Sequence, residues 1–203
     1  MQALTFHGKM TLHYERVTDP EIITPADVLL KTHCAGICGS DLHVYHERET
    51  GLEHGTVMGH EIVGEIVALG KSVQHFKIGD SVFSPFTSNC GQCFYCEIGL
   101  TARCERGQLL GWRQNGVGLH GAQAEYVRIP FADATLLRVP EEIHAEEALL
   151  LGDILSTGYF CAEQAEIKPQ GAVAIIGCGP VGIMALFAAR ELGAEKIFAI
   201  DSI

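Results

Sequence analysis

The chain has 203 residues, of which 47% are hydrophobic and 19% are charged, and its formal net charge is −11. This length and apolar content suit one ordinary domain or two small ones, and they exclude a disordered tail. General nucleic-acid binding is not expected, because an acidic chain repels phosphate backbones. The N-terminus shows neither a basic start nor the apolar segment of a secretory signal, so we expect a cytoplasmic protein.

Residues 1–140 have the sequence patterns of a β-rich region. Alternating or β-branched apolar residues predict short strands at 10–16, 27–33, 62–69, 81–83, 123–129 and 135–139. These patterns follow the two-residue repeat of a half-buried strand. A series of short strands is typical of a barrel or sandwich-like β domain.

The pattern changes near Pro140. Residues 144–165 are rich in Ala, Leu and Glu and predict a helix, with interruptions around Gly152 and Gly158. Further along, a strand at 172–176, a helix at 180–192 and a strand at 196–201 are expected. The apolar runs of both strands are typical of buried parallel strands, so this segment predicts one strand–helix–strand unit.

One stretch has the length of a membrane span. Residues 172–189 are 18 residues without a charge, which reaches the usual threshold. The breakers in this stretch are Gly177, Gly179, Pro180 and Gly182. A strand, a glycine turn and a helix explain it better, so no membrane interaction is expected.

Four cysteines are closely spaced in the segment at about 88–106. Cys90, Cys93, Cys96 and Cys104 follow the pattern C-x2-C-x2-C-x7-C. Four thiolates at this spacing can hold one Zn²⁺, and a closed site of four protein ligands leaves no position for a substrate. The spacing therefore predicts a structural zinc. Unrelated buried cysteines, disulfides and an iron–sulfur cluster are the alternatives.

A second set of metal ligands lies earlier in the chain. Cys38-Gly-Ser-Asp-Leu-His43 follows a predicted strand, and Gly59-His60-Glu61 opens the next one. Together the two fragments supply a thiolate, imidazoles and carboxylates, which suit zinc in a mixed ligand shell.

A glycine turn joins the strand at 172–176 to the following helix. Its sequence, Gly177-Cys-Gly-Pro-Val-Gly182, has the Gly-x-Gly-x-x-Gly pattern in the strand–turn–helix context of dinucleotide-binding folds. The helix N-terminus offers free N–H groups to a pyrophosphate. Asp201 ends the second strand, where a carboxylate binds the ribose hydroxyls and repels a 2′-phosphate. This favours NAD over NADP, although Asp is also a common strand-ending residue.

These motifs, in this order, resemble zinc-dependent medium-chain alcohol dehydrogenases over the whole chain. The resemblance implies a mixed β and α/β fold. A GroES-like β-barrel catalytic domain is expected at 1–150, with the four-cysteine lobe inside it. The beginning of a Rossmann fold is expected at 151–203. A Rossmann domain has about five or six parallel strands and this sequence supplies two, so the resemblance predicts a C-terminally incomplete enzyme.

The resemblance also implies a catalytic zinc held by Cys38, His60 and a third ligand. In many members that ligand is a cysteine just before Ser-Thr-Gly-Tyr, and here Asp153 stands at the position. A carboxylate is a sound zinc ligand, and Glu61 beside His60 is a further candidate. Three protein ligands leave one position for water or an alcohol, whose hydroxyl pKa the metal lowers.

Two features of the family, a proton relay and a carboxylate beside the ligand histidine, match residues after Cys38. Ser40 and His43 match the relay, and Asp41 matches the carboxylate that orients the ligand histidine. A helix N-terminal cap is the other interpretation of Ser40 and Asp41, and both can hold together. Phe86 matches an aromatic residue of the substrate pocket and is equally explained by core packing.

The predicted cofactor contacts come from the glycine turn and its surroundings. They are Thr157 near the nicotinamide, and Gly177, Gly179, Pro180, Val181, Gly182 and Asp201. With two zinc ions per chain and NAD, the resemblance implies reversible hydride transfer between a zinc-bound alcohol and an aldehyde or ketone. It also implies a homo-oligomer. A truncated, non-catalytic zinc-binding GroES-like module is the alternative. A hydrolytic zinc enzyme would leave the glycine turn unexplained.

Overall fold

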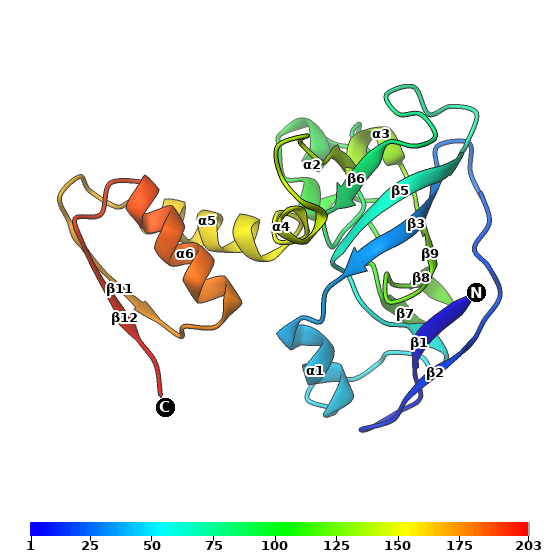
Figure 1. The fold of residues 1–203 in the computed structure, drawn as a ribbon, viewed down its shortest axis with the longest axis horizontal. Coiled ribbons are helices and arrows are strands. Elements are labelled where there is room, and N and C mark those ends of the chain that lie inside the picture. Colours follow the sequence, from blue (N-terminus) through cyan, green and yellow to red (C-terminus); the bar gives the residue numbers. More distant parts are fainter. Residues whose placement is uncertain (203) are drawn as a thin grey trace. The chain divides into compact units, whose positions relative to one another are not determined.

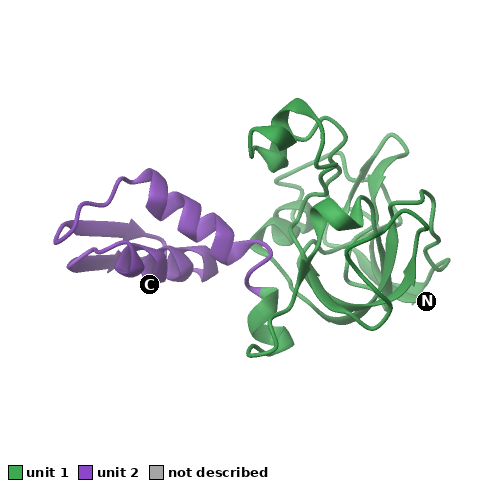
Figure 2. Cartoon of the chain, turned by 90° about the horizontal axis from the view of Figure 1, so that it is seen from above, with its two compact units in different colours: residues 1–149 green, residues 150–203 purple. Residues whose placement is uncertain are grey.

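The computed structural model describes residues 1–202, which form two compact units. The first is Met1–Leu149 and the second is Leu150–Ile203 (Figure 2). The division lies one residue before the boundary expected from the sequence. Each unit is described below by itself.

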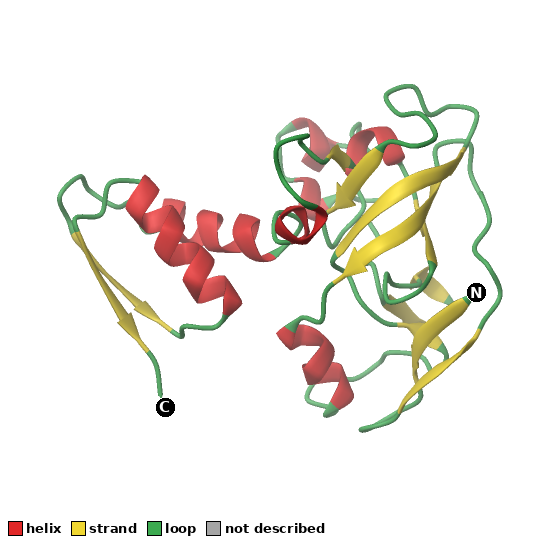
Figure 3. Cartoon of the chain, viewed as in Figure 1, coloured by secondary structure: helices red, strands yellow, loops and turns green. Residues whose placement is uncertain are grey.

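Two sheets and a hairpin make up the β structure of the first unit (Figures 1 and 3). The smaller sheet has the order β2-β1-β4, with β1 (Gln2–Phe6), β2 (Leu12–Arg16) and β4 (Thr56–Val57). The larger has the order β10-β6-β5-β3-β9, with β3 (Val28–Ala35), β5 (Ile62–Leu69), β6 (Ser81–Ser84), β9 (Tyr126–Ile129) and β10 (Leu137–Arg138). The hairpin joins β7 (Trp112–Gln114) to β8 (Val117–Leu119).

The core of this unit lies on the larger sheet. Leu30 on β3 and Ile62 and Ile66 on β5 are buried, and Val82 and Ile129 join them from the neighbouring strands. Burying each such side chain contributes roughly 1.5–3 kcal/mol. This burial stabilises the antiparallel pairing of β3 with β5. The pairing places the end of β3 beside the start of β5, where the site described below lies.

Several details of the predicted β region need correction. The mixed fold class is confirmed, but among residues 1–202 the strands form separate sheets and not one closed barrel. The sequence analysis missed β1 and the β7–β8 hairpin, whose strands are short. Residues 135–139 are not one strand, because α3 (Ala132–Thr135) precedes β10. Thr135 is fully buried there and hydrogen-bonds to the backbone of Asn89, so it ties the helix to the residue before Cys90.

The remaining helices of the first unit are short. They are α1 (Gly39–Tyr45), α2 (Phe94–Glu97), the 3-10 helix η1 (Thr101–Arg103) and α4 (Ala145–Leu149). The helix α1 follows β3 directly, and α2 and η1 shape the four-cysteine segment. These positions place both predicted sets of metal ligands at the ends of regular elements.

The second unit contains α5 (Ile154–Gln164) and the predicted strand–helix–strand segment. The strands β11 (Ala172–Ile176) and β12 (Lys196–Ile200) pair in parallel, and α6 (Pro180–Glu191) connects them. The uncharged stretch at 172–189 is thus a strand, a turn and a helix, and no helix within residues 1–202 has the length and apolar character of a membrane span.

Two expectations about this unit are wrong. Helix α5 continues through Gly158, where a side chain would come within 2.6 Å of the Ala185 backbone nitrogen, so the glycine permits close packing of α5 on α6. The apolar strands are also more exposed than expected, with Ile176 at 84%. The reason is that among the described residues the sheet has two strands.

Candidate functional site

The four-cysteine lobe brings its sulfur atoms together. Cys93 caps the N-terminus of α2, Cys104 follows η1, and the four Sγ atoms lie within 4.8 Å of one another. The Cys93 Sγ is 3.5 Å from that of Cys96 and 3.8 Å from that of Cys104. Tetrahedral zinc with bonds of about 2.3 Å spaces its sulfurs by about 3.8 Å, whereas a disulfide bond is about 2.05 Å long. The lobe fits a structural zinc and excludes the disulfide interpretation.

Hydrogen-bond donors around the lobe favour thiolates. The Cys104 Sγ accepts hydrogen bonds from the backbone nitrogens of Cys90 and Arg106, at 3.2 and 3.4 Å. The backbone N–H of Gln92 and the Arg106 side chain lower the pKa of Cys90 to about 6, against the opposing effect of burial. Burial raises the pKa of Cys104 to about 11. A metal cation supplies the charge that ionises such a thiol.

Cys38 and His60 meet at the adjacent ends of two neighbouring strands of the larger sheet, β3 and β5. Cys38 follows β3 and caps α1, while His60 precedes β5. Because β3 and β5 are antiparallel, with Ala35 opposite Ile62, the end of one strand lies beside the start of the other. The Cys38 Sγ and a ring nitrogen of His60 are within 4.8 Å of each other. Despite burial, the His60 ring and the Ser40 hydroxyl lower the pKa of Cys38.

Asp41 caps α1 and also lies beside His60. One carboxylate oxygen accepts a hydrogen bond from the Cys38 backbone nitrogen at 2.9 Å, which completes a capping box on α1. The other lies 3.6 Å from the His60 Nδ1. The same side chain therefore caps the helix and faces the ring of the candidate ligand.

Ser40 and His43 both lie on α1. The Ser40 Oγ is 3.4 Å from the His60 Nε2, so the hydroxyl stands on the side of the ring opposite Asp41. His43 is exposed in the last turn of the helix, three residues after Ser40 and thus on the same face. Ser40 thus lies near the start of α1 and His43 near its end.

Glu61 and Gln123 also lie around this pair. The Glu61 side chain is buried against Gly36, where a Cβ atom would come within 2.1 Å of its Oε2. The Gln123 Nε2 donates to the carbonyl of Gly36 at 2.9 Å and to Asp41 at 3.4 Å. Sequence analysis missed Gln123, because an isolated Gln in a predicted strand has no motif around it. Phe86 is half-buried, and its carbonyl accepts a hydrogen bond from Leu110.

In the second unit, Asp153 caps the start of α5. The Thr157 hydroxyl donates to the Asp153 Oδ1 at 3.0 Å, and the Thr157 backbone nitrogen donates to the Asp153 carbonyl at 2.8 Å. Thr157 itself is exposed. Asp153 is thus the N-cap residue of α5, and Thr157 lies in the first turn of the helix.

The glycine turn has the geometry that its pattern requires. Gly177 has a φ of +96°, which favours glycine. A Cβ atom on Gly182 would lie 1.8 Å from the Gly177 carbonyl oxygen, so this position must remain glycine for α6 to approach the turn. Gly179 has a φ of −70°, and a Cβ there would meet nothing within 4 Å. The Asp201 Oδ2 accepts a hydrogen bond from the Cys178 backbone nitrogen at 2.7 Å, which holds the carboxylate beside the turn.

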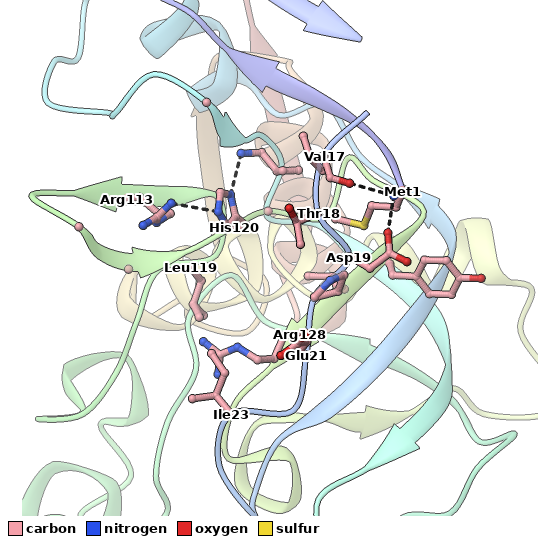
Figure 4. A pocket seen from close by; sticks show the side chains of 18 residues that line it. Met1, Val17, Thr18, Asp19, Glu21, Ile23, Arg113, Leu119, His120 and Arg128 are labelled. Carbon is pink, nitrogen blue, oxygen red and sulfur yellow. Dashed lines mark hydrogen bonds and ion pairs between the residues drawn. The ribbon is translucent and has the colours of Figure 1, made fainter. Parts of the chain in front are cut away.

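A separate pocket of about 590 Å³ lies in the first unit (Figure 4). Arg113, His120 and Arg128 line it together with Asp19 and Glu21. The His120 Nδ1 accepts a hydrogen bond from the Val57 backbone nitrogen. None of the site residues predicted from the sequence lines this pocket.

Comparisons with known proteins agree with the motifs. Residues 24–141, more than half of the chain, match the family described as "Alcohol dehydrogenase GroES-like domain". The chain belongs to this alcohol dehydrogenase family. The match confirms the resemblance and contains both the Cys38–His60 pair and the four-cysteine lobe.

Three relatives show how far the similarity extends. The medium chain reductase/dehydrogenase ucsI of Acremonium sp is 40% identical over all of this chain and 70% of its own length. The zinc-type alcohol dehydrogenase B of Aspergillus flavus is 42% identical over all of this chain and 48% of its own. The solved structure of alcohol dehydrogenase TADH from Thermus sp. ATN1 is 43% identical, with a TM-score of 0.95 over all of this chain and 58% of that one.

This member of the alcohol dehydrogenase family thus spans about half to two thirds of its relatives. The similarity also reaches beyond residue 141, because these alignments cover the glycine turn of the second unit.

Proposed function

We propose that this chain belongs to a zinc-dependent, NAD-linked alcohol dehydrogenase. The enzyme transfers a hydride reversibly from a small alcohol to NAD and so produces an aldehyde or ketone. The observation that carries the proposal is the grouping of four side chains where β3 ends and β5 begins. These residues are Cys38, Ser40, Asp41 and His60. The names of the relatives from Aspergillus flavus and Thermus point to the same activity.

The proposed catalytic zinc is held by Cys38 and His60, with Asp153 as the third ligand and Glu61 as a further candidate. The assignment of Asp153 comes from its motif before Ser156-Thr-Gly-Tyr159. When bound, zinc supplies a Lewis acid that makes a substrate hydroxyl more acidic. Asp41 faces the His60 Nδ1 at 3.6 Å, and in a zinc-bound protein it would help to orient this ring.

The chain's own residues provide a route for the substrate proton. Ser40 is placed beside the ligand atoms by its contact with the His60 Nε2, and its hydroxyl can both accept and donate a proton. His43 on the same helical face would carry the proton to solvent, since the two ring nitrogens of an imidazole can accept and donate a proton. Phe86 is proposed as an apolar wall of the substrate site.

The proposed dinucleotide site is the glycine turn with Asp201. The open space at Gly179 and the N-terminus of α6 at Pro180 and Val181 suit a pyrophosphate, while Asp201 suits the ribose hydroxyls. Thr157 is proposed as a neighbour of the nicotinamide. With the structural zinc of the four-cysteine lobe, the full set is two zinc ions and one NAD per chain.

The setting of the enzyme completes the proposal. We place it in the cytoplasm as a homo-oligomer that acts on small molecules, without a nucleic-acid or membrane partner. The net charge of −11 supports the exclusion of nucleic acid.

Two glycine variants test the cofactor assignment. In Gly179→Ala the new methyl group meets no protein atom, so we expect an unchanged melting temperature and NADH binding weakened at least tenfold. In Gly182→Ala it meets the Gly177 carbonyl, so both stability and binding should fall. NADH fluorescence titration and thermal melts of the purified protein measure both quantities. If Gly179→Ala binds NADH normally, the turn is not the pyrophosphate site. If the unaltered protein binds no NADH, a non-catalytic zinc module is favoured.

A further inference from the structure

We propose that the β1–β2 hairpin carries an additional zinc site, formed by His7, His13 and Glu15 and separate from both sites above. One ligand atom from each of these residues lies within 4.8 Å of the others. The three side chains play no part in the proposed dehydrogenase chemistry.

The strand register explains why these residues meet. In the antiparallel pair, Thr5 on β1 lies opposite His13 on β2, and Ala3 lies opposite Glu15. Side chains two residues apart on a strand point to the same face, so His13 and Glu15 share a face. His7 extends the Thr5 side of β1 onto that face. Four polar side chains of the hairpin therefore converge on one side.

Contacts within the group hold two of the three ligands in place. The His7 Nε2 donates a hydrogen bond to the Glu15 Oε1 at 2.7 Å, and the buried Thr5 hydroxyl donates to the same oxygen at 2.5 Å. The exposed His13 ring stacks on His7 with the centroids 4.2 Å apart and the planes at 23°, so it must turn about its side-chain torsions for both imidazoles to bind one ion. Thr5 thus acts as an outer partner that orients the carboxylate, a feature of built metal sites.

The donor set selects for a zinc-like ion. Two imidazoles and one carboxylate match the ligands that zinc uses in sites with an open fourth position. Magnesium and calcium prefer shells of oxygen atoms. The Glu15 carboxylate supplies the negative charge of the set, and its Oε1 is the atom that faces His7. On binding, the His7 Nε2 gives up its hydrogen bond to Glu15 and binds the ion as the neutral tautomer, whose proton is on Nδ1.

An ion bound at this site would connect the two strands of the hairpin. His7 and the two β2 ligands lie on opposite sides of the turn between β1 and β2, so one ion would link both arms. A ligand that binds the folded state alone raises the melting temperature, and the rise grows with the logarithm of its concentration above the dissociation constant. Added zinc should therefore stabilise the protein through this hairpin.

The test compares His13→Ala with a matched control, His75→Ala. His13 is exposed, so its removal leaves the fold intact. His75 faces a carboxylate of Asp133 at 4.0 Å, and within residues 1–202 no group of three metal ligands includes it. After equilibrium dialysis against micromolar Zn²⁺, we expect His13→Ala to lose one zinc per chain by mass spectrometry and to lose the zinc-dependent rise in melting temperature. The control should keep both, and Glu15→Gln should repeat the loss.

Two outcomes would overturn the site. One is an equal zinc content in His13→Ala and the unaltered protein, and the other is an equal loss in the His75→Ala control. Turnover and NADH binding should remain unchanged in His13→Ala, so the result is independent of the proposed dehydrogenase function. Dialysis against Mg²⁺ should leave no bound ion at this position.

Discussion

The four-cysteine lobe and the Cys38–His60 pair of the first unit differ in how the chain builds them. The four-cysteine lobe takes all its ligands from 15 consecutive residues, and short turns around Cys93 and Cys104 close it. The pair Cys38 and His60 comes from two segments that only the pairing of β3 with β5 brings together. Four thiolates close a structural zinc site, whereas three protein ligands leave a position open for chemistry, and we propose that the Cys38–His60 pair belongs to a site of the second kind.

The largest expected effect belongs to the assembled site. Replacing Cys38 with Ala removes a proposed zinc ligand, and the several kcal/mol of charge stabilisation lost with the metal correspond to a fall in turnover of about 10³-fold or more. The four-cysteine zinc should remain. Metal content and alcohol-dependent NADH formation are measured on the same sample.

Cys34→Ala is the matched control for this variant. Cys34 lies on β3 near Cys38, and its thiol donates to the Ala145 carbonyl, away from the proposed metal. Turnover and zinc content should both stay close to those of the unaltered protein. A similar loss in both variants would mean that the strand, and not the ligand, is responsible.

A smaller effect is expected when the partner of the ligand histidine changes. In Asp41→Asn the negative charge that faces His60 is lost, while an amide oxygen can still cap α1. We expect zinc affinity at the assembled site to fall about 10–100-fold, with the lobe unaffected. Competition with a chromophoric chelator measures the affinity. An unchanged affinity would reduce Asp41 to a helix cap.

The cofactor site should respond more weakly still. In Asp201→Asn we expect NADH affinity to fall about tenfold, because the charge that binds the ribose hydroxyls is lost. NADPH affinity should fall less or rise, because the repulsion of the 2′-phosphate is also lost. Parallel titrations with both nucleotides give the ratio. A ratio that stays constant would remove Asp201 from the ribose site.

The four-cysteine lobe should have the smallest effect on turnover and a marked effect on stability. Cys96→Ala opens the closed zinc shell, so we expect the lobe to lose its ion and residues 88–106 to become sensitive to protease. Cys161→Ala, at an exposed position of α5, is the control. If the lobe variant loses turnover as completely as Cys38→Ala, the contrast between the two sites fails.

The same contrast explains what the sequence could predict. The grouping of the four cysteines could be predicted, because these residues and the glycines between them are neighbours in the chain. The glycine turn could also be predicted. A Cβ atom on Gly182 would lie 1.8 Å from the Gly177 carbonyl oxygen, so no other residue fits there. Both depend on local backbone geometry, which a motif records directly.

Features that depend on distant pairing were harder to predict. The hydrogen bond from Gln123 to Asp41 joins residues that are far apart in the chain, and the His7–His13–Glu15 group depends on the register of a strand, β1, that the sequence analysis missed. The division of the strands into separate sheets likewise follows from long-range pairing. No local pattern specifies such contacts.

Stepwise removal of zinc tests the central claim most directly. A small chelator should first extract the ion from the open site at Cys38 and His60, while the closed lobe retains its own. We predict that NADH formation from alcohol disappears in proportion to this ion and returns when Zn²⁺ is added back. Full turnover in protein that retains only the four-cysteine zinc would contradict the account.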